Sequence, residues 1–573
     1  MIAPKTHRRV ILVVGAAAYL AIAVCYFARI WQRPGYLIIG GHGDAEQFAW
    51  FLQWTPFAVS HGHNPLFTDF INYPRGVNLM WNTSVFLPGM VVAPLTALAG
   101  PVVAYNAVMT LAPALAATCA MFAICRYGSV GAAWAGGLLY GFSPYMIAQS
   151  FGHANLVLTA YLPLLLLLLD EILVRQRRGV WTMGVALGLL TAVQFLTGEE
   201  VLGIALIGAA MTMGVTAALA WHQVRPRLPH GARVLGVSVA VFGLTCGWPA
   251  YFQFFGPERV LGAIQPGGVY VADLLSYVVP TRLEVLAPGW AVAVSGRFTG
   301  NLSELGAYLG VVLIGLMVLT TIRLWRLLAV RIAALTGAGL VVLSFGPRLH
   351  LAGSRLPIPL PGIAIDRLPV VRDVLAVRLA LGVYLSAAIL FALFLDAAWK
   401  RDWPVRWLGL SAGVAAIALL VPNYPFPAAP DLTPPFFRSP PARLLPGEVV
   451  LLAPLSRDAG STEPMLWQAE SGMRFKTPSG YFTGSSAAPP LLGGRLSNLA
   501  ASMRDAESGA PARSPSPAEV VEMRGELTRL RISTVAVGPS RGEATEIELF
   551  TTLLGHRPEE NQGVYVWWDV TSN

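Results

Sequence analysis

Charged side chains are scarce in this sequence. Asp, Glu, Lys and Arg together make up 12% of the 573 residues, whereas a soluble domain carries roughly 25%. Hydrophobic residues make up 55%, and many of them lie in long runs without a charge. This combination excludes an ordinary soluble protein and predicts an integral membrane protein.

Cysteine is also scarce, and none of the four cysteines lies in a polar loop. Cys25, Cys119, Cys125 and Cys246 all fall inside apolar runs and lack the spacing of metal-binding loops. The sequence therefore indicates neither a disulfide framework nor a zinc module.

The net charge of +9 does not indicate nucleic-acid binding. The Lys and Arg residues lie in short clusters between apolar runs, which is how a membrane protein fixes its orientation. We therefore expect membrane lipids, and no nucleic acid, as partners of these residues.

Eleven apolar runs are each close to the ~20 residues that a spanning helix needs. They cover residues 10–28, 102–125, 131–149, 155–174, 180–197, 201–220, 234–255, 304–322, 332–346, 376–398 and 405–421. The first run is also compatible with a signal peptide, but we prefer an uncleaved helix because the residues 26–29 that follow are a poor cleavage site. A further run, Phe86–Ala99, is short and contains Pro88 and Pro94, so we expect it to be re-entrant.

Basic clusters predict the orientation of the chain. There are five of them: Lys5/Arg8/Arg9, Arg175/Arg177/Arg178, Arg225/Arg227/Arg233, Arg323/Arg326/Arg331 and Lys400/Arg401/Arg406. All five are cytoplasmic if the N-terminus is inside and the short run does not cross. We therefore predict a multi-pass protein of the cytoplasmic (plasma) membrane whose C-terminal part lies outside.

The predicted fold class is mainly α, a polytopic α-helical membrane protein with about eleven spans and a small C-terminal extracytoplasmic α/β domain. The membrane domain covers residues 1–421, with an outer, candidate catalytic loop at 29–85. A proline-rich linker at 422–446 leads to the α/β domain at 447–573. In that domain we expect strands at Glu448–Leu455, Thr534–Val537 and Gly563–Val570, helices at Ala518–Arg531 and Ala544–Leu554, and a loose loop at Arg504–Pro517.

The first outer loop carries two carboxylates after a glycine-rich turn, Gly40 to Gly43. A transferase that acts on a hydroxyl needs a general base within hydrogen-bond distance, and a carboxylate can also hold a divalent metal such as Mg²⁺ or Mn²⁺ against a phosphate leaving group. Asp44 and Glu46 would not share a face of a regular helix. They point to one cavity if Asp44 lies on the turn and Glu46 in the first helical turn. Asp44 with Gln47 also resembles a helix N-cap with its box partner.

Aromatic residues dominate the stretch after Asp44. Phe48 to Phe57 favours a helix in the interface plane, with its rings at headgroup level. His61 and His63 follow, as candidate metal ligands or as turn residues. Further along the same loop, Trp81 and Asn82 provide a ring for sugar stacking and an amide for hydrogen bonds, unless they belong to an ordinary polar loop.

Other polar residues gather at the outer ends of the predicted spans. His153 and Asn155 lie at a turn between two spans, and Glu199 and Glu200 lie where another span ends. Ionisable residues at membrane depth are functional candidates. Adjacent carboxylates in a short outer turn can equally be solvated, so both interpretations of the glutamates stay open.

An arginine-rich outer loop breaks the positive-inside pattern. It contains Arg348, Arg355, Arg367, Arg372 and Arg378. Arginine suits bidentate contacts to phosphate, and ion pairs with Asp366 and Asp373 are the alternative. Glu304 and Tyr308, at the outer end of another span, are further candidates to line the cavity.

A first helix followed by an acidic outer loop, an aromatic in-plane helix and many spans resembles the GT-C superfamily of glycosyltransferases that use polyprenyl-phosphate sugars. Five stretches also resemble a group of actinobacterial-type membrane proteins assigned to this superfamily: Asp44–Pro56, Asn78–Pro88, His153–Pro163, Gly198–Leu202 and Ser344–Arg378. The resemblance covers most of the membrane part, and its motifs are loose.

The resemblance implies a hexosyl- or pentosyltransferase. Such an enzyme moves a sugar from a polyprenyl-phosphate carrier to an envelope glycan, lipid or protein outside the membrane. By this resemblance Asp44 is the catalytic base or a metal ligand. Glu46 is the second catalytic candidate, although the Asp-x-Glu spacing departs from the adjacent acidic pair of some members.

Two other functions remain as alternatives: a flippase or transporter of lipid-linked glycans, and a non-catalytic envelope assembly protein. A transporter should carry charged residues deep within its spans. Here the spans are nearly free of charge and the polar groups gather at one rim. This pattern favours an enzyme that works from one side.

Overall fold

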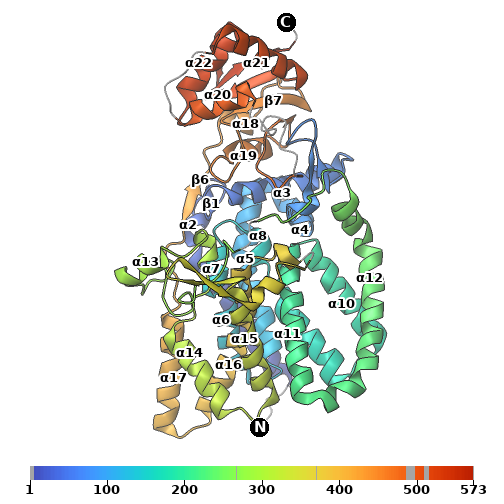
Figure 1. Cartoon of the computed structure of the whole chain (residues 1–573), viewed down its shortest axis with the longest axis vertical. Helices are drawn as coiled ribbons and strands as arrows, with labels where there is room; N and C mark the ends of the chain where they lie inside the picture. The colour runs from blue at the N-terminus through green and yellow to red at the C-terminus, as the bar shows by residue number, and fades with distance from the viewer. Residues whose placement is uncertain (1–4, 266–267, 369–370, 486–496, 509–514, 572–573) are drawn as a thin grey trace. The chain divides into compact units, whose positions relative to one another are not determined.

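The computed structural model describes residues 5–265, 268–368, 371–485, 497–508 and 515–571. The chain forms two compact units, and each unit is assembled from three separate stretches of sequence (Figure 1). Unit 1 comprises Met1–Gln32, Ala107–Gly247 and Ala263–Pro427, and unit 2 comprises Arg33–Asn106, Trp248–Gly262 and Ala428–Asn573.

Unit 1 is mainly helical, and helices lie within each of the eleven expected apolar runs. The run 155–174 is interrupted at residues 158–160, and the run 304–322 continues as an α-helix only from Val311. The helices are α1 (Lys5–Tyr26), α5 (Pro101–Ile124), α6 (Val130–Gly141), α7 (Pro144–Gln149), α8 (Ala154–Val157), α9 (Tyr161–Asp170), α10 (Val180–Phe195), α11 (Glu199–Val224), α12 (Leu228–Phe255), α14 (Val311–Arg323), α15 (Leu328–Ser344), α16 (Ala380–Trp399) and α17 (Trp403–Ala418). Shorter elements are α2 (Ala28–Trp31), α13 (Gly289–Ser295), the 3₁₀ turns η4 (Leu302–Glu304) and η7 (Ala376–Leu379), and the hairpin strands β4 (Arg348–Leu351) and β5 (Ser354–Pro359).

Four helical segments of the described chain are long and apolar enough to cross a membrane, judged by length and composition. They are Pro101–Ile124, Ala154–Arg175, Glu199–Phe255 and Ala376–Trp399. The expected span 131–149 is instead divided into α6 and α7. Ser143 interrupts it, because its hydroxyl accepts a hydrogen bond from the backbone N–H of Met146 and Pro144 begins the next helix.

Helix α16 is the centre of unit 1. It contacts α6, α14, α15 and α17, and it is buried along most of its length. Glycines allow these close contacts, since a Cβ on Gly136 would come within 2.8 Å of the carbonyl oxygen of Ala388. Small residues at helix interfaces are a common means of close packing in membrane proteins.

Unit 2 contains a five-stranded mixed sheet in the order β10-β11-β9-β7-β8. Its strands are β7 (Glu448–Ala453), β8 (Phe475–Lys476), β9 (Thr534–Val537), β10 (Glu559–Asn561) and β11 (Val564–Trp567). Strand β7 is parallel to both β8 and β9, whereas β11 is antiparallel to its neighbours.

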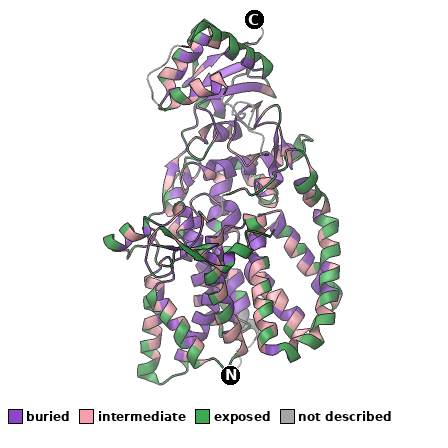
Figure 2. Cartoon of the chain, in the orientation of Figure 1, coloured by how far each residue is buried: buried purple, intermediate pink, exposed green. Residues whose placement is uncertain are grey.

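Helices cover both faces of this sheet, and side chains alternate between the faces as the strand period requires. Val450 and Leu452 of β7 pack against α18 (Pro435–Arg438) and α19 (Glu463–Glu470). Val449 and Leu451 pack on the other face against α20 (Asn498–Glu507), α21 (Pro517–Arg529) and α22 (Glu543–Leu554). Figure 2 shows the central strands β7 and β9 buried and the outer sides of these helices exposed.

Two expectations for the C-terminal region need correction, and one helix was not expected. The segment expected as a linker contributes β6 (Ala428–Pro430) and α18, and Phe436 and Phe437 are buried in the core of the unit. The expected loose loop begins inside α20, which ends at Glu507, while residues 509–514 lie outside the described residues. The sequence also gave no indication of α19, because its short amphipathic pattern is weak.

The remainder of unit 2 surrounds helix α3 (Asp44–Ser60). This helix contacts α4 (Phe86–Ala99), α19 and β1 (Leu37–Ile39), and β1 pairs antiparallel with β6. The rings of Trp50 and Trp54 stack with a centroid distance of 5.6 Å, and both side chains are almost fully buried. The aromatic face of α3 is therefore packed inside the protein, not spread at headgroup level as the sequence suggested.

Candidate functional site

The glycine-rich turn positions the start of α3. Gly40, Gly41 and Gly43 all have positive φ angles, of 87°, 107° and 93°. Only glycine adopts such conformations at no steric cost. At Gly43 a side chain would also meet the backbone, because an added Cβ would lie 2.9 Å from the carbonyl oxygen of Ala459. The turn therefore requires glycine here for two independent reasons.

Asp44 is the first residue of α3, and Gly43 is its N-cap. The N-cap interpretation of Asp44 is therefore wrong. Glu46 is the residue that reaches back to the cap, since its Oε2 accepts from the Gly43 N–H at 3.4 Å. Both carboxylates thus lie in the first helical turn, where negative charge is favoured by the helix dipole.

Glu46 is buried and both of its carboxylate oxygens are engaged. Its Oε1 lies 2.7 Å from Nδ1 of His42, and its Oε2 accepts from the Thr462 hydroxyl. Thr462 Oγ1 in turn accepts from the Gly43 N–H at 3.0 Å. The hydrogen bond between His42 and Glu46 raises the pKa of His42 above its usual value. Glu46 thus fixes the glycine turn.

Asp44 has a different partner and is only partly buried. The Tyr481 hydroxyl donates to its Oδ1 at 3.0 Å. Gln47 donates to the carbonyl oxygen of Tyr481 at 2.6 Å. One turn of α3 therefore binds both the side-chain hydroxyl and the backbone carbonyl of Tyr481. Asp44 is therefore an oriented carboxylate that is still accessible to solvent.

The two carboxylates do not form a metal site. Glu46 uses both oxygens within the protein, so the pair cannot act as two ligands. Among the described residues, no three His, Cys, Asp or Glu side chains come close enough to hold a metal ion. His61 and His63, the other candidate ligands, stack on the ring of Phe57 with centroid distances of 4.3 and 5.8 Å. These residues do not fit a divalent metal.

Trp81 and Asn82 serve the packing of unit 2. The Trp81 indole donates to the carbonyl oxygen of Gln253 at 2.6 Å, and its ring meets Phe254 edge-on. Asn82 exchanges two hydrogen bonds with the backbone of Thr483, at 2.9 and 2.6 Å. The Asn82 bonds hold the segment that carries Tyr481, so Asn82 contributes to the site indirectly.

Unit 1 brings other predicted residues together. Arg378 donates to Glu304 at 3.1 and 3.2 Å through Nε, and its Nη1 forms an ion pair with Glu200. Only 11% of the Arg378 side chain is exposed. Arg378 therefore forms ion pairs with Glu200 and Glu304, and not with Asp366 or Asp373 of its own loop as the alternative expected. Glu199 precedes Glu200 at the start of α11.

His153 and Asn155 lie near the same part of unit 1. His153 Nδ1 lies 2.6 Å from Oε1 of Gln149, whose amide donates to the Ser303 carbonyl beside Glu304. Asn155 is buried, and its Oδ1 has no hydrogen-bond partner within the described residues. Gln149 thus connects the turn that carries His153 to η4, which carries Glu304.

The other arginines of the loop are exposed. Arg348 lies on β4, Arg367 follows the hairpin, and Arg372 makes only a long contact of 3.8 Å with Asp373. Exposed apolar side chains accompany them, including Leu351, Ile358 and Leu368. Guanidinium groups beside exposed apolar residues suit an amphipathic phosphate.

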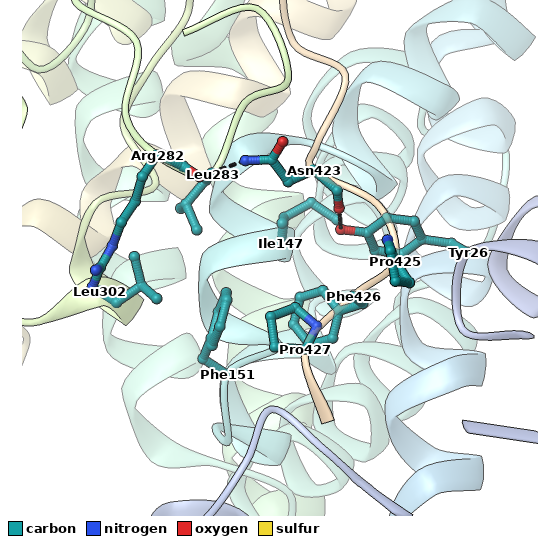
Figure 3. Close-up of a pocket in the computed structure, with 10 residues that line it drawn as sticks. All are labelled: Tyr26, Ile147, Phe151, Arg282, Leu283, Leu302, Asn423, Pro425, Phe426 and Pro427. Carbon is teal, nitrogen blue, oxygen red and sulfur yellow. Dashed lines mark hydrogen bonds between the residues drawn. The ribbon is translucent and has the colours of Figure 1, made fainter. Parts of the chain in front are cut away.

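A pocket of about 300 Å³ lies within unit 1 (Figure 3). Its walls are mainly apolar, and Arg282 is its one charged lining residue. The Tyr26 hydroxyl donates to the backbone carbonyl of Asn423 at 3.2 Å, and the Asn423 amide donates to the backbone carbonyl of Arg282 at 2.6 Å. The lining residues are Tyr26, Ile147, Phe151, Arg282, Leu283, Leu302, Asn423, Pro425, Phe426 and Pro427. None of the residues predicted from the sequence lines it.

Sequence reasoning missed Tyr481 and Thr462. Both lie more than 400 positions from the turn they contact, with separations of 437 and 416 residues. Neither belongs to a motif, so no local signal could have found them.

No family model matches the sequence, and no curated protein matches it. Solved structures do match. The oligosaccharyltransferase of Archaeoglobus fulgidus tethered with an acceptor peptide containing the NVT sequon gives a TM-score of 0.51 at 12% identity, over 96% of this chain and 70% of that chain. Its complex with Zn and sulfate gives 0.50 at 14% identity, over 92% and 68%. The arabinofuranosyltransferase AftD from Mycobacteria gives 0.47 at 16% identity, over 98% and 41%.

The chain has the GT-C fold. The likeness extends over nearly the whole described chain and confirms the superfamily resemblance at the level of the fold. Within this GT-C fold, α3 carries Asp44 at its first position and the loop of β4 and β5 carries the exposed arginines.

Proposed function

We propose that this chain is a membrane glycosyltransferase that takes a sugar from a polyprenyl-phosphate carrier and transfers it to an acceptor hydroxyl outside the cytoplasm. The GT-C fold supports the general activity and does not favour the transporter or the assembly protein. The acceptor class we propose is an envelope glycan, lipid or protein.

The observation that carries the proposal is the contrast between the two carboxylates of α3. Glu46 is 1% exposed and is fully occupied in fixing the turn. Asp44 is accessible and is held in one orientation by Tyr481. A general base must be both oriented and reachable by the acceptor. Asp44 is the residue to which we assign that role.

We assign Glu46, His42 and Thr462 to positioning the base. The Gly43 N–H and the Glu46 carboxylate are both tied to Thr462. Removing any of these contacts would let the turn relax and would move Asp44. A misplacement of about 1 Å can lower a rate by about 10²-fold.

We assign binding of the donor to unit 1. The exposed Arg348, Arg367 and Arg372 suit the phosphate, and the apolar pocket beside Arg282 suits part of the lipid chain. Arg378 is not assigned to the phosphate, because two carboxylates already hold it. Its role here is to fix the end of the arginine loop.

A deletion strain complemented with variants tests the proposal. The envelope glycans and lipids of the strain would be compared by mass spectrometry after return of the parent chain, of Asp44→Asn and of Asp505→Asn. Asp505 is exposed on α20 of the same unit, so its substitution is a matched control. We expect the missing glycan to return with the parent and with Asp505→Asn only. Full restoration by Asp44→Asn would overturn the proposal.

A further inference from the structure

A second group of polar side chains lies in unit 2, at the carboxyl ends of the parallel strands β7 and β9. These strands end at Ala453 and Val537. The group takes no part in the Asp44 site, and we call it the carboxyl-edge cluster. Its members are Ser456, Arg457, Glu507, Ser540 and Glu546.

The cluster lies where the strand order of the sheet reverses. From β7 the chain goes to β8 on one side, and it then returns to β9 on the other side of β7. The segment after β7 leads to α19 on one face, and the segment after β9 leads to α22 on the opposite face. In open α/β sheets, ligands bind outside the carboxyl ends of strands at such a reversal.

Direct contacts join two pairs of side chains within the cluster. Arg457 forms an ion pair with Glu507 at 3.3 Å, and Glu507 also accepts from the Leu455 N–H at 2.5 Å. Ser540 donates to Oε2 of Glu546 at 3.0 Å. A Cβ on Gly542 would lie 2.4 Å from the carbonyl oxygen of Ala506, so α20 and α22 meet at this point.

Three polar atoms of the cluster have no hydrogen-bond partner within the described residues: the Ser456 hydroxyl, Nη1 of Arg457 and Oε1 of Glu546. Ser456 is 1% exposed and Glu546 is 0% exposed. An unsatisfied buried polar group costs roughly 1–3 kcal/mol, so three such groups in one place need an explanation. A bound ligand that supplies the missing hydrogen bonds would explain them.

The charges of the cluster favour a neutral ligand. Asp458, Pro539 and Arg541 are exposed on the two segments that carry the cluster. Burial raises the pKa of Glu546 to about 8, so at neutral pH this group carries a proton. Arg457 forms ion pairs with both Asp458 and Glu507, each at 3.3 Å, which leaves no net positive charge for an anion.

We propose that the carboxyl-edge cluster is a saccharide-binding subsite that takes one sugar unit of a glycan. Each sugar hydroxyl both donates and accepts, as the unpartnered serine, guanidinium and carboxyl groups require. The position of the site follows from the sheet. The choice of a saccharide as ligand rests on the proposed function.

The subsite is linked to the Asp44 site through two segments of unit 2. Residues 454–462 begin beside the cluster and end at Thr462, which holds Glu46. The carbonyl oxygen of Ser456 accepts from the Gly480 N–H at 2.8 Å, and Gly480 is next to Tyr481. A sugar bound at the cluster would order both segments that position Asp44.

Direct binding to the purified full chain in detergent tests the proposal. The probes are the methyl glycosides of mannose, galactose, glucose and arabinose and their disaccharides, followed by saturation-transfer NMR. We expect at least one to bind, and we expect Ser456→Ala and Glu546→Ala to weaken it by about tenfold or more, as for loss of one hydrogen bond. Glu548→Ala, an exposed change on the same helix, should bind as the parent does.

The outcomes separate this proposal from the proposed function. Binding of none of these probes, or equal binding by all variants with unchanged melting temperatures, would overturn the subsite and leave a cluster satisfied by buried water. Asp44→Asn should bind the saccharide with parental affinity. If the parent transfers no sugar while Ser456→Ala and Glu546→Ala still lose binding, the proposed function alone fails.

Discussion

Tyr481 donates its hydroxyl to Asp44 across a sequence separation of 437 residues. The contact joins the first turn of α3 to the segment between β8 and the rest of the C-terminal sheet. The C-terminal part of the chain is therefore a component of the candidate active site and not an appendage.

We expect Asp44→Asn to abolish most transfer without unfolding the chain. The change removes the negative charge but keeps the shape, and a general base contributes about 10²–10⁴-fold to a rate. Tyr481→Phe removes only the orienting hydrogen bond and should cost less, about tenfold. Turnover of purified variants measures both. A Tyr481→Phe enzyme that is slower than Asp44→Asn would contradict the assigned roles.

Arg378→Ala should destabilise the protein strongly. It would leave Glu200 and Glu304 as buried charges without their cation, and breaking a buried pair costs about 3–5 kcal/mol. Arg367→Ala is the matched control, because that side chain is exposed and surface changes are usually within about 0.5 kcal/mol. Denaturation midpoints compare the two. Equal midpoints would show that the three-residue ion cluster contributes nothing to stability.

Gly43→Ala should be more harmful than Gly62→Ala. Both glycines have positive φ, 93° and 72°, so both substitutions strain the backbone by roughly 1 kcal/mol. Only the alanine at position 43 would also press its Cβ against the carbonyl oxygen of Ala459, at 2.9 Å. A Cβ added at Gly62 would have no atom within 4 Å. Melting temperatures and transfer rates should fall further for Gly43→Ala. Equal losses would mean that the contact with Ala459 is relieved cheaply.

The stability of unit 2 should depend on the ionisation of Glu470. Burial raises the pKa of this group to about 7, above the ordinary value of about 4.3. Because the folded chain binds the proton more tightly, the contribution of Glu470 is fully present below pH 4 and is lost as the pH rises to about 7. Glu470→Gln should therefore melt at a more nearly constant temperature across this range. Parallel melting curves of parent and variant would refute the assignment.

The sequence by itself determined the positions of the apolar helices and the main strands of the tail. A run of about twenty apolar residues can satisfy its backbone only as a helix in a membrane, so local composition sufficed for α5, α11 and α16. The same holds for β7 and β9, whose apolar character is continuous because the sheet is covered on both faces. The glycine turn and Asp44 were also visible locally.

Only the tertiary structure decided which polar groups meet. Arg378 pairs with Glu200 and Glu304 and not with Asp373, which is nearer in the sequence. Glu46 stabilises the glycine turn because the Thr462 hydroxyl donates a hydrogen bond to it. Such choices depend on the packing of distant segments, which residue type and spacing do not encode. A buried charge takes the partner that the packing brings within reach, since leaving it unpaired costs more than any local preference can offset.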